Sequence, residues 1–209
     1  MSTPDASIDP RILESAKNAF LEQGYQNTQL KDICRDAGVT TGALYKRYHG
    51  KEDLFRALVE DAVEEIRAIV DQHSAQDPAL LTDEELLRSW DMYTSTWSMQ
   101  VWFDFLYARR DAFTLLLSCS DGTRYKDFLP QWVEAMTVGT FAYEEECVRR
   151  GMVDAPVSLG ELQVLMSSFW AMIYQPFLLH FSKEELDAHC EIVCRMFHWK
   201  ELLQLHLPD

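Results

Sequence analysis

The chain has 209 residues and a formal net charge of −15, with 47% hydrophobic and 25% charged residues. These proportions are typical of a globular protein and exclude a wholly disordered chain. The acidic balance also excludes a protein whose entire surface is basic, as a non-specific nucleic-acid binder would require. One segment, residues 24–51, reverses this balance, because its acidic residues are outnumbered by Lys31, Arg35, Lys46, Arg47 and Lys51.

The spacing of apolar residues predicts helices along the whole chain and no strands. In the first third, Gly24 is expected to end a first helix, Thr28 to cap a second, and Gly38 to separate the second from a third. Beyond Pro78 the predicted helices are longer and the breaks are fewer. The predicted helical ranges are 9–23, 29–36, 40–48, 51–73, 83–106, 109–118, 123–150, 158–181 and 184–206.

Residues 29–48 have the pattern of a helix-turn-helix, in which two short helices are joined by a three-residue turn that contains Gly. Gly38 supplies the positive φ that so tight a turn requires. Cys34 and Ala37 are small enough to let the two helices approach closely. The second helix carries short residues first and basic residues later, which suits an entry into a DNA groove flanked by phosphates.

The run AGVTTGALYKRYHGKEDLF, preceded by AFLEQGYQNTQLKDICRD, resembles the DNA-binding domain of the tetracycline-repressor (TetR) family of transcriptional regulators. The resemblance covers residues 8–68. It implies a DNA-binding domain at 8–68 followed by a larger helical domain at 69–209 that binds an effector and dimerises. It also implies that DNA is contacted by Thr28, Thr40, Thr41, Gly42, Ala43, Tyr45, Lys46, Arg47 and Lys51.

The resemblance also implies separate roles within this set. Thr28 and Tyr45 are expected at phosphates, and Lys51 is expected to clamp the DNA backbone electrostatically. Thr41, Gly42 and Ala43 would face base edges or backbone, and Lys46 a base or a phosphate. Three alternatives stay open: Thr28 as a cap alone, Tyr45 as core packing, and Arg47 either solvated or paired with Asp36 or Glu52.

The second domain is expected to hold a small-molecule effector among its aromatic side chains. Aromatic residues line apolar pockets and hold cations on their ring faces, so the expected effector is apolar or cationic. The alternative is that these side chains form only hydrophobic core. The residues predicted to contact the effector are Trp97, Phe103, Tyr107, Trp132, Met136 and Trp170.

Residues 158–181 and 184–206 are apolar on more than one face, which indicates an interface that one chain alone does not supply. Four such helices from two chains, packed about a two-fold axis, would form a homodimer. A dimer would also place two recognition helices about 34–36 Å apart, which matches one turn of DNA. The predicted interface residues are Leu162, Leu165, Met166, Phe169, Ile173, Phe177, Ile192, Met196 and Trp199.

Several other kinds of site are not expected. The sequence carries no hydrolase, zinc-protease or nucleotide-binding motif, so we expect no enzyme activity and no cofactor. Cys190 and His198 are eight residues apart on one helix, about 12 Å, which is too far to share a metal ion, and no metal is expected. The acidic run 144–146 is expected on a solvated helix face. Residues 162–182 lack charge, but their polar residues disfavour a membrane span.

These features together predict an all-α, homodimeric, cytoplasmic regulator. It would repress transcription from a palindromic DNA operator and be released by a small-molecule effector. Within the same class, an activator or an effector-independent regulator stays open. From another class, a helical ligand carrier or an enzyme with a vestigial DNA-binding domain stays open, although neither requires basic residues around a recognition helix. A helical adaptor that binds a protein partner is a further alternative.

Overall fold

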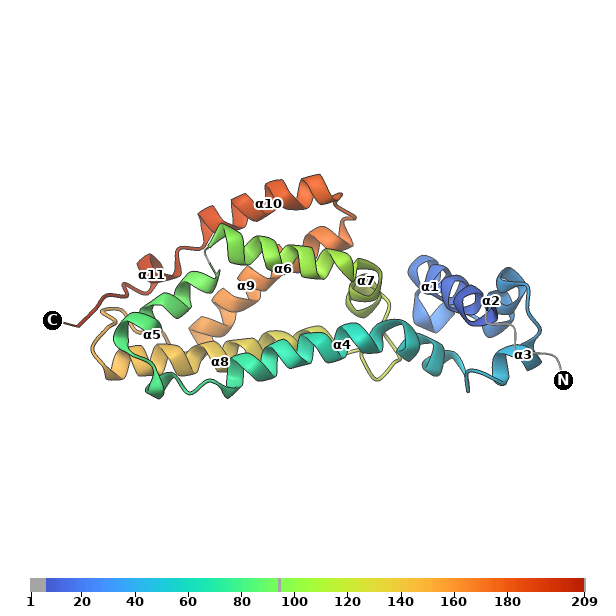
Figure 1. Ribbon diagram of the computed structural model, residues 1–209, viewed down its shortest axis with the longest axis horizontal. Helices are drawn as coiled ribbons and strands as arrows, with labels where there is room; N and C mark the ends of the chain where they lie inside the picture. Colours follow the sequence, from blue (N-terminus) through green and yellow to red (C-terminus); the bar gives the residue numbers. More distant parts are fainter. Residues whose placement is uncertain (1–6, 94, 209) are drawn as a thin grey trace. The chain divides into compact units, whose positions relative to one another are not determined.

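The computed structural model describes residues 7–93 and 95–208, which form an all-α fold (Figure 1). The only extended pairing among these residues is an isolated bridge between Val153 and Leu205. The all-α prediction is therefore confirmed. The chain divides into two compact units, one of residues up to 66 with 109–129, the other of residues 67–108 with 130 onwards. Because compactness does not assign a function, the domains predicted at 8–68 and 69–209 stay predictions.

The first unit contains α1 (Ile8–Asn27), α2 (Leu30–Ala37), α3 (Thr41–Tyr45), the first part of α4 (Lys51–Ala75) and α7 (Arg110–Ser118). α1 leaves helical geometry at Gly24, where φ is +74°, as the sequence predicts. An aromatic cluster joins α1 to α4, with ring centroids of Phe20 and Phe55 5.4 Å apart. The fully buried core of the helix-turn-helix consists of Ile12, Phe20, Ile33, Leu44, Leu54 and Phe55.

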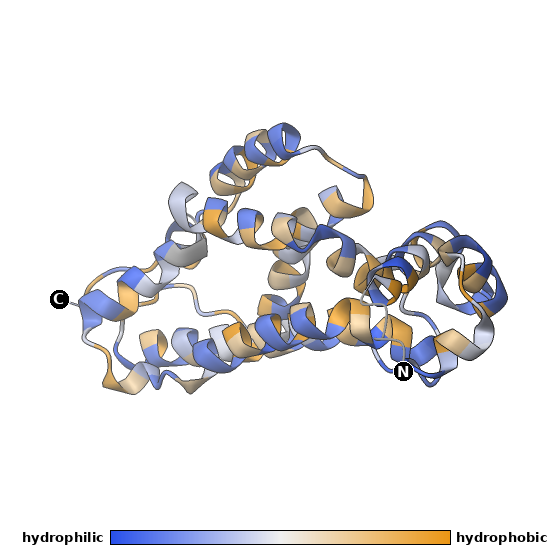
Figure 2. Cartoon of the chain, turned by 45° about the vertical axis from the view of Figure 1, so that its right-hand side comes forward, coloured by the Kyte–Doolittle hydropathy of each residue, from blue (hydrophilic) through white to orange (hydrophobic). Residues whose placement is uncertain are grey.

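The second unit contains the end of α4, most of α8 (Phe128–Arg149), α5 (Asp83–Ser89), α6 (Thr96–Ala108), α9 (Leu159–Leu178), α10 (Lys183–Met196) and α11 (Trp199–Leu202). Two 3-10 turns, η1 (Pro78–Leu80) and η2 (Trp90–Tyr93), flank α5. Hydrophobic and hydrophilic faces alternate around the helices of both units (Figure 2). None of the helices in the described ranges is long and apolar enough to span a bilayer.

Three helices of the second unit begin at capping boxes that can be read from the sequence. Thr82, Ser158 and Ser182 each precede a Glu by three residues, and in each case the hydroxyl accepts the N–H of that Glu while its carboxylate accepts the N–H of the cap. These reciprocal bonds satisfy backbone donors that a helix N-terminus otherwise leaves without a partner. They fix where α5, α9 and α10 start.

Two long predicted helices are interrupted. The range 83–106 is divided by η2 into α5 and α6, and the range 184–206 is divided at residues 197–198 into α10 and α11. At the second break Phe197 is extended, and its ring and that of Trp199 both pack on Phe169, with centroids 5.1 and 5.8 Å from it. Residues two apart point in different directions on an α-helix, so this shared contact requires extended backbone.

The expectation that residues 144–146 form a solvated face is wrong. Glu144 and Glu146 are buried, and only Glu145 is exposed. Glu146 accepts hydrogen bonds from Arg149 and Arg150, and these guanidinium groups hold its pKa at about 2. Arg150 also donates to the carbonyl of Leu81 (2.7 Å). Glu146 can be buried because the basic side chains three and four residues later neutralise it, whereas Glu144 accepts the backbone N–H of Val157 (3.1 Å).

Candidate nucleic-acid interface

A three-residue turn at 38–40 sets the geometry of the helix-turn-helix. Gly38 has φ +64°, and the N–H of Val39 donates to the carbonyl of Cys34 (2.9 Å), which closes the end of α2. A Cβ on Gly38 would lie 3.1 Å from the guanidinium of Arg11. The predicted need for glycine at this turn is therefore confirmed on two grounds, the left-handed backbone and the close approach of Arg11.

α3 is shorter than the predicted range 40–48, because it ends at Tyr45. Thr40 is its N-cap, and the Thr40 Oγ1 accepts the N–H of Ala43 (3.1 Å). Leu44 is fully buried and anchors the helix to the core, so the opposite face is turned outward. Tyr45 is 54% exposed, which rules out the alternative that it is core packing. The other exposed residues of this face are Thr40, Thr41, Gly42 and Lys46, and Ala43 is half-buried.

Arg47, two residues after the end of α3, forms an ion pair with α1. Its Nε lies 2.7 Å from Asp9 Oδ1, so its partner is neither of the acids that the sequence suggested. Arg47 also donates to the carbonyl of Ala43 (3.4 Å). A contact between Arg47 and DNA stays a prediction, and it would have to compete with Asp9.

Lys51, at the start of α4, is held by groups of its own chain. Its Nζ donates to the carbonyl oxygens of Tyr25 (2.5 Å), Gln26 (3.1 Å) and Thr28 (3.0 Å), and it lies 4.3 Å from the centroid of the Tyr25 ring. Partial burial lowers its pKa. The ammonium thus binds the segment between α1 and α2 to α4, and clamping of DNA by Lys51 stays a prediction that requires it to leave these partners.

Thr28 does not cap α2 as the sequence suggested. The N-cap is Gln29, whose side chain makes no capping bond, and Thr28 is buried. The Thr28 hydroxyl donates to the carbonyls of Gly24 (2.8 Å) and Ala19 (3.1 Å). The reason is Gly24, whose positive φ turns the chain so that the hydroxyl meets these two carbonyls of α1. Its role at a phosphate therefore stays a prediction.

Arg11 supports the turn and was not singled out from the sequence. Its guanidinium donates to the carbonyls of Ala37 (3.1 Å from Nε) and Gly38 (3.1 Å from Nη2), at the C-terminal end of α2. These carbonyls have no partner within the helix, and a cation is favoured there by the helix dipole. The donor and acceptors are 26 and 27 residues apart, so no local pattern could have shown this contact.

Known proteins are similar to this chain over the same helix-turn-helix segment. Residues 12–58 match the family described as "Bacterial regulatory proteins, tetR family". The helix-turn-helix segment is therefore of the tetR-family type. The HTH-type transcriptional regulator TtgR of Pseudomonas putida is 42% identical over 50 residues, which cover 24% of each chain. The HTH-type transcriptional repressor BepR of Brucella suis biovar 1 is 28% identical over 101 residues, 47% of this chain and 48% of that one.

The likeness to solved structures extends over almost the whole chain. A TetR-family transcriptional regulator from Bordetella parapertussis 12822 superposes with a TM-score of 0.63 at 18% identity, over 93% of this chain and 95% of that one. At this identity the match shows the fold alone. In sequence, the matched segments span about a quarter to a half of the curated relatives' lengths. The shared fold is thus accompanied by a divergent second unit.

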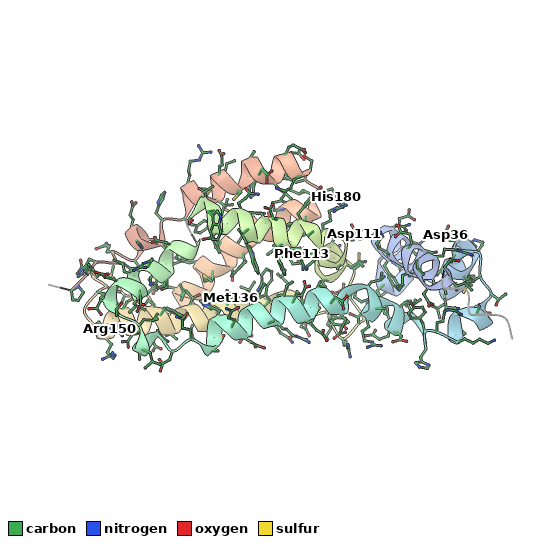
Figure 3. All side chains as sticks on the ribbon, viewed as in Figure 1. Asp36, Asp111, Phe113, Met136, Arg150 and His180 are labelled. Carbon is green, nitrogen blue, oxygen red and sulfur yellow. The ribbon has the colours of Figure 1, made fainter. Side chains whose placement is uncertain are left out.

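In that second unit, a cavity of about 340 Å³ lies among α4, α6, α8 and α9. Two of the six predicted effector contacts, Met136 and Trp170, line it, and Met136 is labelled in Figure 3. Phe103 and Trp132 are buried, and Trp132 packs on Trp170 with centroids 4.6 Å apart. The other two are placed differently: Tyr107 is half-buried and Trp97 is 76% exposed.

The residues that α4 contributes to the cavity were missed by sequence reasoning, which looked only for aromatic side chains. They are Ile69, Gln72 and His73, followed by Gln76. The His73 ring stacks on Tyr143 with centroids 5.3 Å apart, and burial lowers its pKa. On α8, Gly139 lets this ring approach, because a Cβ there would lie 3.0 Å from His73 Cδ2.

The predicted dimer residues fall into two groups. Six are buried within the single chain, so they add no area to a surface: Leu162, Met166, Phe169, Ile173, Phe177 and Trp199. Leu165 is half-buried, and Ile192 and Met196 are 43% and 62% exposed. Val164, which was not predicted, is 66% exposed on α9. Hydrophobic periodicity identifies apolar faces but does not say whether the same chain covers them.

The cysteines give no sign of a metal site. Cys190 and Cys194 are buried one turn apart on α10, and burial raises the pKa of Cys190 to about 12. His189, next to them, has its Nε2 2.8 Å from the carbonyl oxygen of Met172. No group of three metal-ligating side chains gathers in the part of the chain that the structure describes.

Proposed function

We propose that this chain is a DNA-binding transcriptional regulator, a repressor that dissociates from a palindromic operator when a small-molecule effector binds. The observation that carries the proposal is the exposed face of α3, where short side chains precede Tyr45 and Lys46. A helix with that profile approaches base edges at its N-terminus and places a hydroxyl and a cation at phosphates. The match of residues 12–58 to the tetR family supports the same interpretation.

Selection of bound sequences from a random duplex pool, at near-physiological salt, tests this function. We expect a palindrome whose half-sites are one helical turn apart. Thr41→Ala should weaken binding to the selected site more than binding to random duplex, because Thr41 is placed at the groove. Lys126→Ala is the matched control, since its side chain is exposed and lies outside α3. Recovery of sequence-indifferent DNA, or of none, would contradict specific repression and favour a ligand carrier.

A homodimer formed through α9 and α10 is part of the proposal. The supporting observation is the exposure of Val164, Ile192 and Met196 on these two helices, because large exposed apolar side chains mark interaction surfaces when they gather. In sedimentation experiments we expect a dimer that Val164→Asp shifts towards monomer. The exposed Leu80, 83% accessible and outside both helices, provides the control variant Leu80→Asp. A wild-type monomer at micromolar concentration would contradict this part.

Coupling between effector and DNA is proposed to run through α4. This single helix begins with Lys51, which holds the segment before α2, and its last turns contribute Ile69, Gln72 and His73 to the cavity. A ligand that displaces those last turns would act on the start of the same helix. By thermodynamic linkage, DNA must weaken effector binding by the factor by which the effector weakens DNA binding. Equal effector affinity for free and operator-bound protein would refute this coupling.

A further inference from the structure

The cavity among α4, α6, α8 and α9 has no charged wall. Its lining residues include no Asp, Glu, Lys or Arg among those described, and its titratable member is His73. Burial lowers the pKa of His73 and so favours the neutral imidazole. An ion that entered would lose hydration without gaining a counter-charge, which is strongly unfavourable. Although the chain as a whole is acidic, a cation would meet indole faces in this wall but no carboxylate to offset the loss of its hydration.

The α4 side of the wall is polar and exposed, whereas the α8 and α9 side is apolar and buried. Phe169, Trp170 and Ile173 on α9 are buried, as is Met136 on α8. Gln72 and Gln76 on the α4 side are exposed. A ligand is therefore expected to place its apolar part against α8 and α9 and its polar part at the exposed amides.

The inner wall favours flat rings. Trp102 and Trp170 both line the cavity, with centroids 5.9 Å apart and ring planes at 65°. Aromatic rings pair well in offset or edge-to-face arrangements, so a flat aromatic guest that enters the cavity would meet ring surface of its own kind. The volume of about 340 Å³ lies at the lower end for small-molecule sites, which suits two or three fused rings.

The exposed amides favour an acceptor on the ligand. The Gln76 Oε1 accepts the hydroxyl of Tyr143 (3.2 Å), so the amide nitrogen of Gln76 is the end left to bind a guest. An amide nitrogen donates hydrogen bonds and does not accept them. The ligand group that meets it is therefore an oxygen or nitrogen with a lone pair.

We propose that the effector of this cavity is an uncharged, flat aromatic molecule of two or three rings that carries a hydrogen-bond acceptor such as a carbonyl oxygen. The inference rests on the proposed function, since it names the ligand class of the effector site. It narrows the sequence-based expectation of an apolar or cationic effector by removing the cation. It also assigns Trp102 and Gln76 to the site.

A matched series of three naphthalene derivatives tests the charge requirement by isothermal titration calorimetry at pH 7. The probes are 2-acetylnaphthalene, 2-naphthoate and 2-naphthamidinium, which share one ring system and one planar substituent but differ in charge. We expect the ketone to bind at least tenfold more tightly than either ion. Ions that bind within tenfold of the ketone would overturn the proposal, and so would failure of the ketone to bind.

Variants of the two exposed amides assign the probe to this cavity. Gln72→Lys should raise the affinity for 2-naphthoate at least fivefold, because it supplies the missing counter-charge from an exposed position that tolerates it. Gln76→Met should lower the affinity for the ketone about fivefold, the usual effect of losing one hydrogen bond. Trp97→Phe is the control, because Trp97 is on α6 but outside the cavity. An unchanged affinity for naphthoate in Gln72→Lys would place the probe elsewhere and overturn the assignment.

Failure of this inference can be told apart from failure of the proposed function. Selection of DNA sequences uses the effector-free protein and does not involve the cavity. A chain that selects a palindrome but does not prefer the ketone retains the regulator proposal and refutes the ligand class. A chain that prefers the ketone but selects no DNA retains the ligand class and refutes the regulator.

Discussion

Replacement of Lys51 by methionine removes the ammonium and keeps the length of the side chain. In the structure this ammonium donates to the carbonyls of Tyr25, Gln26 and Thr28 and lies over the Tyr25 ring. The substitution would leave three carbonyls without their donor and would remove the cation from the ring. We therefore expect Lys51→Met to destabilise the first unit, whereas the sequence alone predicted an effect on DNA binding only.

The expected loss in the free energy of unfolding follows from these contacts. A hydrogen bond to a charged group contributes about 1.5–3 kcal/mol, and a cation over an aromatic ring about 0.5–1 kcal/mol at an exposed site. The three hydrogen bonds do not add fully, because Lys51 is half-buried and its partial desolvation opposes them. A net loss of about 2 kcal/mol remains, which lowers the Tm of a chain of this size by about 4–8 °C.

Two measurements separate the structural role of Lys51 from a role at DNA. Thermal unfolding, with hydrogen exchange of the peptides around residues 25–28, reports the stability of the contacts that Lys51 makes with this segment. The salt dependence of binding to random duplex reports phosphate contacts, at a slope of about 0.9 per phosphate. Lys126→Met, an exposed substitution in the same unit, should leave both unchanged. If Lys51→Met kept its Tm and lost about one unit of slope per chain, the structural role of Lys51 would be refuted.

Three further substitutions have expected outcomes. Gly38→Ala forces a side chain into a left-handed turn and should cost about 1–2 kcal/mol in urea unfolding, whereas a cost below about 0.5 kcal/mol would deny the strain. Thr28→Val removes a hydroxyl whose single proton is shared between two carbonyls and should cost about 1–3 kcal/mol, with Thr28→Ser largely restoring it; equal losses would count against this hydrogen bond. Glu146 has a pKa of about 2, below its ordinary 4.5, so its pairing with Arg149 and Arg150 stabilises above about pH 4.5 and is lost as pH falls towards 2. Glu146→Gln should flatten the dependence of Tm on pH in that range, and an unchanged acid sensitivity would rule this out.

The helix-turn-helix could be predicted in detail because its signals are local. The end of the first helix at Gly24 and the left-handed turn at Gly38 depend on backbone conformations that glycine favours, and both are confirmed. The length of α3 was overestimated, because the residues after Tyr45 are also good helix formers. Its end is set by tertiary contacts, including the pairing of Arg47 with Asp9, 38 positions earlier in the chain.

The contacts that Arg11 and Lys51 make could not be predicted, because they join residues distant in sequence. Arg11 reaches the turn at Gly38, and Lys51 reaches the segment at 25–28, each across more than twenty positions. Likewise, the apolar faces of α9 were predicted to be buried between two chains, but most of them are covered by the same chain. Leu162 and Phe169 are fully buried without a second copy, so periodicity correctly indicated burial and not the identity of the covering partner.

The close approach of His73 to Gly139 offers a way for ligand preference to diverge among relatives of this chain. Gly139 lies against His73 but does not itself line the cavity, and a methyl group there would press on the imidazole at 3.0 Å. The ring can yield only by moving relative to α8, and it forms part of the cavity wall. A single added carbon at position 139 would therefore change the size of guest admitted, although the guest never touches that residue. Selectivity can thus evolve from outside the site, with the set of contacting side chains left intact.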